Sequence, residues 1–422
     1  MQKEYTFFFD ESFHDRSINR LSNGNLNIMT PDSLESYIGV FCGFPTKDTE
    51  KITLKYLAFE SKIKKLFNLS DIQELKTENF HRKNFRFGIQ SMGKPVFQFY
   101  KEFFTLLNEV KPIIYFDCIS KIEFLLRKVF RNLKFSNDCI FSKDAFFYSL
   151  TKFLINYHTD KLLALLFQPT TQSNPGVLQK EINITLETIL NYIENIKRKE
   201  KEYRSFVELQ HILVTATFDL DIEEKVNFSY SPNCEQFLKF LRVQNISNKS
   251  ISIVIDNEEN TFNAMQQGNF LSVRQDDSKQ CALLRGTDFI SGFVGRIIFA
   301  LYNDEAFKEN PISDINDISF NDLETKRLRS KNWFKLTKER FPLYNLIYEV
   351  LLKNQKQISP YSSYADQEIS FQSLIEYIGI QDWNEFSNYN TTSMNPEYFN
   401  TFLCEKIQEY YNYRFYSSQN YC

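Results

Sequence analysis

The stretch Tyr5–Ser12 (YTFFFDES) most constrains what this chain can fold into. Strand-forming residues run from Tyr5 to Phe9 and end at the acidic pair Asp10-Glu11. This pattern predicts a buried strand with a carboxylate at its tip. An ionised Asp beside Phe side chains is costly to bury unless a cation balances it, and a divalent metal ion is one such cation. A strand-end cap or an exposed position is the simpler explanation for Asp10 taken alone.

Three further apolar runs predict strands at Tyr37–Phe44, Ile113–Ile119 and Ile251–Asp256. The last of them (ISIVID) repeats the opening pattern, because a β-branched run again ends in a carboxylate. Asp117, in the run at Ile113–Ile119, is a rival for a site position, although a strand-end residue before a polar turn explains it more simply. With amphipathic helices between these runs, the chain reads as an α/β protein built around a mixed five-stranded sheet.

Composition excludes several classes of protein. A chain of 422 residues suits two or three packed units. The seven cysteines lie far apart with no CxxC pair, which argues against structural zinc. Free thiols without a signal peptide predict a cytoplasmic protein, and no apolar run is long enough to predict a membrane span. A net charge of −3 gives no global basic field, so any contact with nucleic acid must come from local patches.

The pattern of periodicity divides the chain into four parts. Helical spacing dominates from about residue 122 to 250, where the strand pattern then returns. Beyond about residue 306 the chain is again helical, and it is highly polar. We therefore predict an α/β core formed by residues 1–121 and 251–305. A helical insertion (122–250) splits this core, and a helical C-terminal region (306–422) follows it.

Four carboxylates stand out by their position. Asp10 and Asp256 end apolar strands, Glu74 lies close to the start of a helix or turn, and Asp288 lies on an apolar helix at Leu283–Arg296. The order strand, helix, strand, helix lets all four converge at one edge of a sheet beneath a helix. Oxygen ligands suit Mg²⁺ or Mn²⁺. Two such ions about 4 Å apart can activate a water and stabilise the leaving oxygen of a phosphodiester.

Two glycines on the same helix, Gly292 and Gly295, predict close packing against a neighbouring element. Local basic patches interleaved with aromatic residues occur twice, around Phe80–Arg86 and around Trp333-Phe334. A solvated surface is the default interpretation of such patches, and contact with phosphates and bases is the functional one. The candidate nucleic-acid contacts in these patches are Arg82, Lys83, Arg86, Lys326, Arg327, Arg329, Lys331 and Lys335.

Several short motifs in this order resemble a known bacterial family. They are the DES strand, ELK at Glu74–Lys76, VID ending at Asp256, the DSK triplet ending at Lys279, and DFISG beginning at Asp288. Together they resemble RNase H-like proteins of unknown function that open with a DES strand and end in a DSK…QLADLIAG helix. The resemblance spans Tyr5 to about Leu301, with residues 122–250 as an insertion.

The resemblance implies an RNase H-like fold with a carboxylate site for Mg²⁺ or Mn²⁺. It implies that the catalytic and metal-binding acids are Asp10, Glu74, Asp256 and Asp288. Lys76 and Lys279 match the lysines of the family, and they would contact phosphate or a developing charge. Arg285 departs from the family pattern, where a Gln-Leu-Ala run is usual, and we expect it to point to solvent or to a nucleic-acid substrate.

Three functions are compatible with this sequence. The first is a metal-dependent phosphodiesterase, a nuclease acting on DNA or RNA. The second is a catalytically inactive RNase H-like scaffold that binds partners through its helical additions. The third is a toxin or defence effector, directed against foreign nucleic acid, that needs a partner to act. The sequence leaves a protein partner or a homo-oligomer open.

Overall fold

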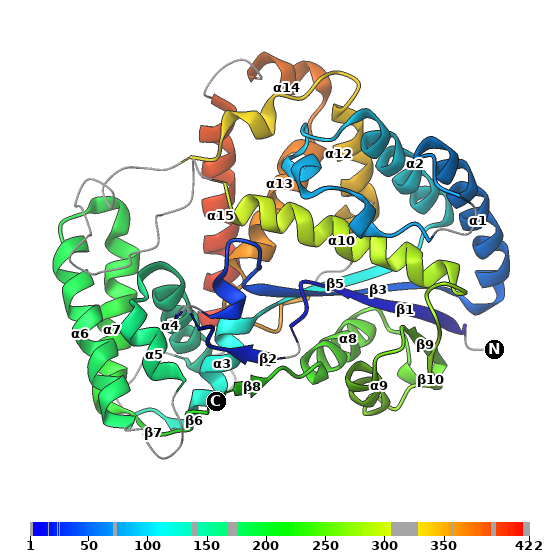
Figure 1. The fold of residues 1–422 in the computed structure, drawn as a ribbon. Coiled ribbons are helices and arrows are strands. Elements are labelled where there is room, and N and C mark those ends of the chain that lie inside the picture. The colour runs from blue at the N-terminus through cyan, green and yellow to red at the C-terminus, as the bar shows by residue number, and fades with distance from the viewer. Residues whose placement is uncertain are drawn as a thin grey trace.

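The computed structural model describes residues 3–15, 17–22, 24, 26–70, 74–136, 142–167, 175–223, 225–304, 328–353, 355, 358–389 and 394–416. No helix among these residues combines the length and the apolar character needed to cross a membrane. A mixed five-stranded sheet lies at the centre of the molecule (Figure 1). In spatial order its strands are β10 (Ser272–Gln275), β9 (Ile251–Ile255), β1 (Tyr5–Ser12), β3 (Ser36–Pro45) and β5 (Ile113–Ser120).

The strand directions divide the sheet at its central strand, β1. β1 and β3 are antiparallel, as are β3 and β5, whereas β1, β9 and β10 all run parallel. The register places Asp10 opposite Val40 and Phe9 opposite Ile255. The predicted α/β fold with a mixed five-stranded sheet is therefore confirmed. β10 was not predicted as a strand, because this edge strand carries a single apolar residue, Val273.

One face of the sheet is covered by a layer of helices (Figure 1). Phe8 and Val254 point into this layer, where they join the largest buried cluster of the protein. The central helix of the layer is α10 (Ala282–Tyr302), which packs directly on β1 and β3. The other helices of the layer are α1 (Thr49–Leu66), α2 (Lys94–Val110), α12 (Phe341–Tyr348) and α13 (Asp366–Gly379).

Two shorter helices, α8 (Ser231–Val243) and α9 (Glu259–Gln266), cover the opposite face (Figure 1). Phe7 and Phe9 point to this side, because side chains alternate along a strand, and they pack with Phe237 of α8. The stretch predicted as an insertion, 122–250, therefore includes one helix that belongs to the sheet core.

The remainder of that stretch forms a second buried cluster at the side of the sheet, which Ile18, Leu26, Ile28, Tyr37 and Ile119 from the first part of the chain also join. Helices supply most of it, and two small two-stranded sheets complete it. Its helices are α3 (Lys121–Val129), α4 (Lys143–Tyr157), α5 (Asp160–Leu166), α6 (Pro175–Ile193) and α7 (Glu200–Thr215). The small sheets pair β2 (Ser17–Asn19) with β8 (Lys225–Asn227) and β6 (Phe130–Lys134) with β7 (Thr217–Leu220).

The C-terminal region is helical, as predicted, and it completes the core rather than standing apart. α14 (Trp383–Tyr389) and α15 (Met394–Tyr416) follow α13, and residues of all three helices join the cluster above the sheet. Glu368 on α13 accepts a hydrogen bond from the backbone N–H of Cys118 on β5, at 3.0 Å. Residues distant in sequence therefore enclose one core on this face.

Candidate functional site

Asp10 lies near the end of the central strand and faces α10. Its Oδ2 accepts a hydrogen bond from the Ser291 hydroxyl of α10, at 3.0 Å. The same hydroxyl lies 3.1 Å from the backbone carbonyl of Asp288, one turn earlier on the helix. Ser291 therefore links the strand carboxylate to the turn of α10 that carries Asp288.

Asp288 is held by the segment that follows Glu74. The Asp288 Oδ2 accepts hydrogen bonds from the backbone N–H of Thr77, at 2.9 Å, and from its hydroxyl, at 3.0 Å. Thr77 begins the 3-10 helix η3 (Thr77–Asn79), which packs against α10.

The glycines of α10 make this approach possible. A Cβ at Gly292 would lie 2.2 Å from Thr77 Cγ2, and one at Gly295 would lie 2.4 Å from Ser12 Oγ. Any larger residue would push η3 or the end of β1 away from the helix. The predicted close packing at these glycines is confirmed.

Asp256 directly follows β9, and strand alternation places it on the same side as Val254 and Asp10. Its Oδ1 accepts hydrogen bonds from the backbone N–H groups of Asn257, at 2.8 Å, and Ser278, at 3.4 Å. The second contact ties the DSK turn to the end of β9. Asp256 also raises the pKa of Asp10, behind burial and Asp288, so both of these aspartates lie within electrostatic reach of Asp10.

Glu74 lies in an irregular segment before η3 rather than on a helix. Its Oε2 lies 3.3 Å from the Lys76 ammonium. Its Oε1 is buried and has no hydrogen-bond partner among the residues described. A buried carboxylate oxygen without a donor is costly, so this atom retains the capacity to bind a cation or a proton.

The two candidate lysines differ in their surroundings. Burial lowers the pKa of Lys76, but Glu74, Glu78 and Asp256 outweigh that effect and raise it. The charge of Lys76 also acts to lower the pKa of Asp288, so the Lys76 ammonium lies close to the acids. Lys279 is exposed in the turn before α10, and its backbone carbonyl accepts a hydrogen bond from Arg285 at 3.0 Å.

The acids of this group repel one another. Burial, then Asp288, raises the pKa of Asp10 well above its usual value, although the Ser291 hydroxyl opposes the shift. Burial also raises the pKa of Asp288, against the hydrogen bonds from Thr77 and the charge of Lys76. A bound cation would relieve both burial and repulsion, because it favours the ionised carboxylates.

Glu11 and Glu258 form an acidic pair that the sequence pattern did not predict as part of the site. Burial, then Asp10 and a hydrogen bond to Glu258, raises the pKa of Glu11 well above its usual value. A hydrogen bond between two carboxyl groups requires a proton, and Glu258 also accepts from the Thr261 hydroxyl at 2.7 Å. The position of Glu11 within the DES motif was the signal available in the sequence.

The expectation that Arg285 points to solvent or substrate is wrong. Arg285 is 6% exposed, and its Nε and Nη2 donate to the two carboxylate oxygens of Glu60, at 2.9 and 2.6 Å. Its Nη1 donates to the carbonyls of Ser278 and Lys279. Because all of these donors are committed within the protein, Arg285 braces the DSK turn.

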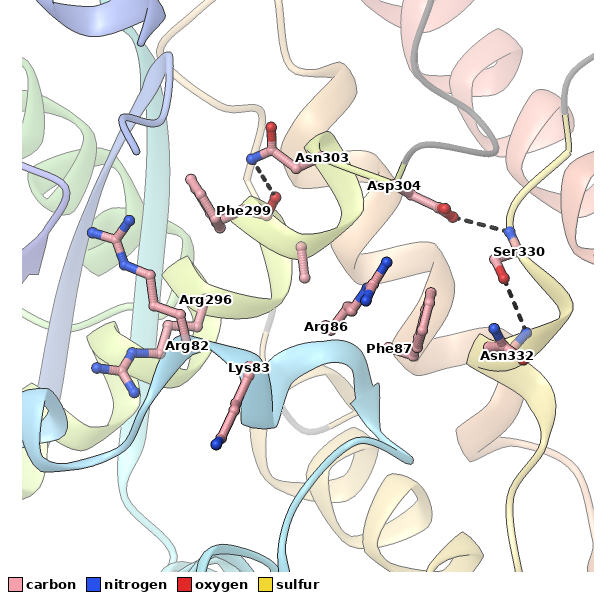
Figure 2. Close-up of a pocket in the computed structure, with 11 residues that line it drawn as sticks. Arg82, Lys83, Arg86, Phe87, Arg296, Phe299, Asn303, Asp304, Ser330 and Asn332 are labelled. Carbon is pink, nitrogen blue, oxygen red and sulfur yellow. Dashed lines mark hydrogen bonds between the residues drawn. The ribbon is translucent and has the colours of Figure 1, made fainter. Parts of the chain in front are cut away.

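The first basic patch is exposed. Arg82 and Lys83 lie on the 3-10 helix η4 (Arg82–Phe85), and Arg86 begins β4 (Arg86–Ile89). All three side chains line a pocket of about 420 Å³ beside the C-terminal half of α10 (Figure 2).

The second basic patch is largely structural. Trp333 and Phe334, on the 3-10 helix η8 (Lys331–Phe334), are 0% and 1% exposed, so neither ring can stack on a base. Arg329 is buried as well, which corrects its assignment as a nucleic-acid contact, whereas Lys331 and Lys335 are exposed. Lys326 and Arg327 lie outside the described residues.

The predicted metal ligands match a hard divalent cation in their chemistry. They are all oxygen donors, and Glu74 offers an unpaired buried oxygen. Within the described part of the chain, however, no group of three or more His, Cys, Asp or Glu side chains could hold a metal ion as the side chains lie. The arrangement therefore gathers the acids around α10 without presenting a finished coordination shell.

No protein-family model, no curated protein and no solved structure matches this chain.

Proposed function

We propose that this protein is a metal-dependent phosphodiesterase that hydrolyses nucleic acid at the acids around α10. The observation that supports the proposal best is the link from Asp10 through the Ser291 hydroxyl to the turn of α10 that bears Asp288. Two acids from distant parts of the sequence are thereby held at one end of the sheet, where Asp256 also lies.

The topology of the sheet supports the same proposal. The chain first forms three antiparallel strands and then two strands that run parallel to the first, which lies at the centre of the sheet. An RNase H-like core is expected to have this order. The acids occupy the central strand, the end of its parallel neighbour and the helix packed across them. This placement agrees with the positions that the motif resemblance implies for the site.

The mechanism follows from the roles available to these side chains. Mg²⁺ or Mn²⁺, held by Asp10, Glu74, Asp256 and Asp288, would activate a water and stabilise the leaving oxygen. Ser291 and Thr77 orient Asp10 and Asp288 by their hydrogen bonds. Lys76, whose side chain is 39% exposed beside Glu74, is placed to attract a phosphate.

The test is cleavage of labelled DNA and RNA by the full chain in Mg²⁺ or Mn²⁺. Asp10→Asn and Asp288→Asn should each reduce the rate by about 10²- to 10³-fold or more, the effect of losing one preorganised electrostatic group. The control is Glu50→Gln, an exposed acid on α1. Circular dichroism should show that all three variants keep the fold. Equal cleavage by the Asp10 variant and the control would refute the proposal.

The second candidate function is an inactive RNase H-like scaffold that acts through its helical additions. It is favoured by one observation, that the acids do not form a finished metal site among the described residues. Calorimetric titration with Mn²⁺ separates the two functions. Binding that is lost in Asp10→Asn supports the enzyme, and absence of binding at millimolar ion supports the scaffold.

A further inference from the structure

A basic and aromatic pocket lies beside the acids but does not include them. It has a volume of about 420 Å³, within the usual range for small-molecule sites. Three segments form it: the region of η4 and β4, the C-terminal half of α10, and the residues around Ser330 and Asn332 (Figure 2). These segments come from distant parts of the sequence, so the pocket is a product of the tertiary fold.

Positive charge dominates the lining of this pocket. Arg82, Lys83, Arg86 and Arg296 contribute four cationic groups. Asp304 is the only acid among the lining residues that the structure describes, and it is 4% exposed. Its Oδ2 accepts from the backbone N–H of Ser330 and from Trp333 Nε1, both at 3.0 Å, so its charge is directed into the protein.

Asp32 lies beside Arg82, and the charge of Asp288 acts on Arg296. Arg82 lies 3.4 Å from a carboxylate oxygen of Asp32, but the Asp32 side chain is 95% exposed, and such a pair is weak in water. Burial lowers the pKa of the Arg296 guanidinium, and the charge of Arg82 acts in the same direction. A partly desolvated arginine beside a second arginine favours an anion such as phosphate.

The same pocket presents partly exposed aromatic rings. Phe299 stacks on Phe13 with ring centroids 5.5 Å apart, and the Arg82 guanidinium lies 5.1 Å from the Phe299 centroid. Phe87 packs edge-on against the buried Trp333, with the Arg86 guanidinium 5.3 Å from the Phe87 centroid. Both rings are partly exposed beside a guanidinium, and a ring or a guanidinium plane can stack on a nucleobase.

The pocket and the acids share one face of α10. Phe299 follows Asp288 by 11 positions in the sequence, close to three full helical turns. At 1.5 Å per residue, the two positions are about 16 Å apart along the helix. Thr77 and Ser12 cover α10 between the two positions, so a strand anchored in the pocket would pass over these residues to reach Asp288 and Asp10.

We propose that this pocket binds one nucleotide unit, with its phosphate on the arginines and its base against the phenylalanine rings. The unit is either a free nucleotide or part of a nucleic-acid strand, since both present the same chemistry. The choice of a nucleotide over other phosphorylated aromatic ligands rests on the proposed function. The location of the pocket and its positive charge are independent of the proposed function.

The test measures binding by the full chain in EDTA, so that metal-dependent cleavage cannot interfere. A short fluorescent single strand is followed by anisotropy, and competition with AMP, dTMP and inorganic phosphate identifies the preferred ligand. Phe299→Leu keeps an apolar side chain but removes the ring. It should weaken strand binding about 5- to 150-fold, the range for losing one base stack.

The charge is tested by a matched pair of double variants. Lys83→Gln/Arg86→Gln should weaken binding at least tenfold and reduce the dependence of affinity on salt, because phosphate contacts are lost. Lys51→Gln/Lys101→Gln removes two exposed cations on α1 and α2, and it should bind as the wild type does. Equal affinity in the two double variants would overturn the proposal.

The remaining outcomes distinguish a free nucleotide from a unit of a strand. They also distinguish failure of the pocket proposal from failure of the proposed phosphodiesterase. Competition by AMP or dTMP assigns a free nucleotide, and competition by longer strands alone assigns a strand unit. Competition by inorganic phosphate as strong as that by nucleotide would refute the nucleotide assignment. A wild type that binds the strand in EDTA but does not cleave it in Mg²⁺ or Mn²⁺ would refute only the proposed phosphodiesterase.

Discussion

Glu123 and Glu74 present the same carboxylate in two very different surroundings. Glu123, in the first turn of α3, is 1% exposed, and its oxygens accept from Arg127 Nε, at 2.7 Å, and from the backbone N–H groups of Ser363 and Tyr364, at 2.9 and 2.7 Å. Glu74 has the Lys76 ammonium near one oxygen and, among the described residues, no hydrogen-bond partner for the other.

The contrast extends to the acids around each of them. Both carboxylate oxygens of Glu60 accept hydrogen bonds from Arg285. Asp10 accepts a hydrogen bond from one hydroxyl group, and two neighbouring aspartates raise its pKa. A carboxylate with a full set of donors contributes to structure. A carboxylate left short of donors and close to like charges is suited to a ligand. The comparison therefore separates bracing acids from candidate site acids, and both can be tested.

The largest effect on stability is expected at the bracing pair. Glu60→Gln leaves the buried Arg285 guanidinium without its counter-charge, which should lower the free energy of unfolding by about 3–5 kcal/mol. Urea denaturation gives the change. The control is Glu200→Gln, which breaks the exposed pair with Arg204 and should cost less than about 1 kcal/mol. Similar losses in the two variants would show that the buried pair does not act as a brace.

The site acids should instead respond to metal. Mn²⁺ at 100 times its dissociation constant should stabilise the wild type by about 2.7 kcal/mol, a rise of a few degrees in Tm. Asp10→Asn should lose most of that increase, while Glu50→Gln should keep it. Thermal melts with and without Mn²⁺ measure both. An equal rise in the Asp10 variant would mean that the ion binds elsewhere.

A third comparison concerns how the stability of the protein depends on pH through two other acids, Asp117 and Asp144. Burial raises the pKa of Asp117 to about 7, although the backbone N–H of Tyr361 and the charge of Arg414 oppose the shift. Its Oδ2 has no hydrogen-bond partner among the described residues. The folded state then binds a proton that the unfolded state releases, so Asp117 makes the protein less stable as pH rises from about 4 to 7.

Asp144 should give the opposite slope. Burial acts to raise its pKa, but Arg414, the Ser363 hydroxyl and Arg127 outweigh burial and lower it. Its contribution to stability is therefore present above the unfolded-state pKa and is lost as pH falls. Relative to wild type, Asp117→Asn should gain stability with rising pH and Asp144→Asn should lose it, as followed by urea denaturation. Parallel pH profiles would contradict this assignment.

Two basic stretches that look alike in sequence show why part of the site was not predictable. The stretch around Arg82 lines an open pocket, while the stretch around Trp333 is drawn into the core by that ring and by its hydrogen bond to Asp304. Both stretches combine Lys and Arg residues with aromatic residues. Which side of each segment faces solvent depends on the elements packed against it, and these lie far away in the sequence.

The sequence by itself determined four of the five strands of the central sheet and the place of the carboxylates along the chain. Apolar runs such as Tyr5–Phe9 and Ile251–Ile255 form strands because of their own composition, which can be recognised without knowing their partners. The carboxylates that follow these runs can be recognised in the same way. Only the tertiary structure decided that Ser291 bridges Asp10 to α10, that Thr77 holds Asp288, and that Arg285 turns inward to Glu60. Each of these contacts joins residues more than 200 positions apart, and a hydrogen bond or ion pair depends on the final distance between two groups rather than on either residue alone.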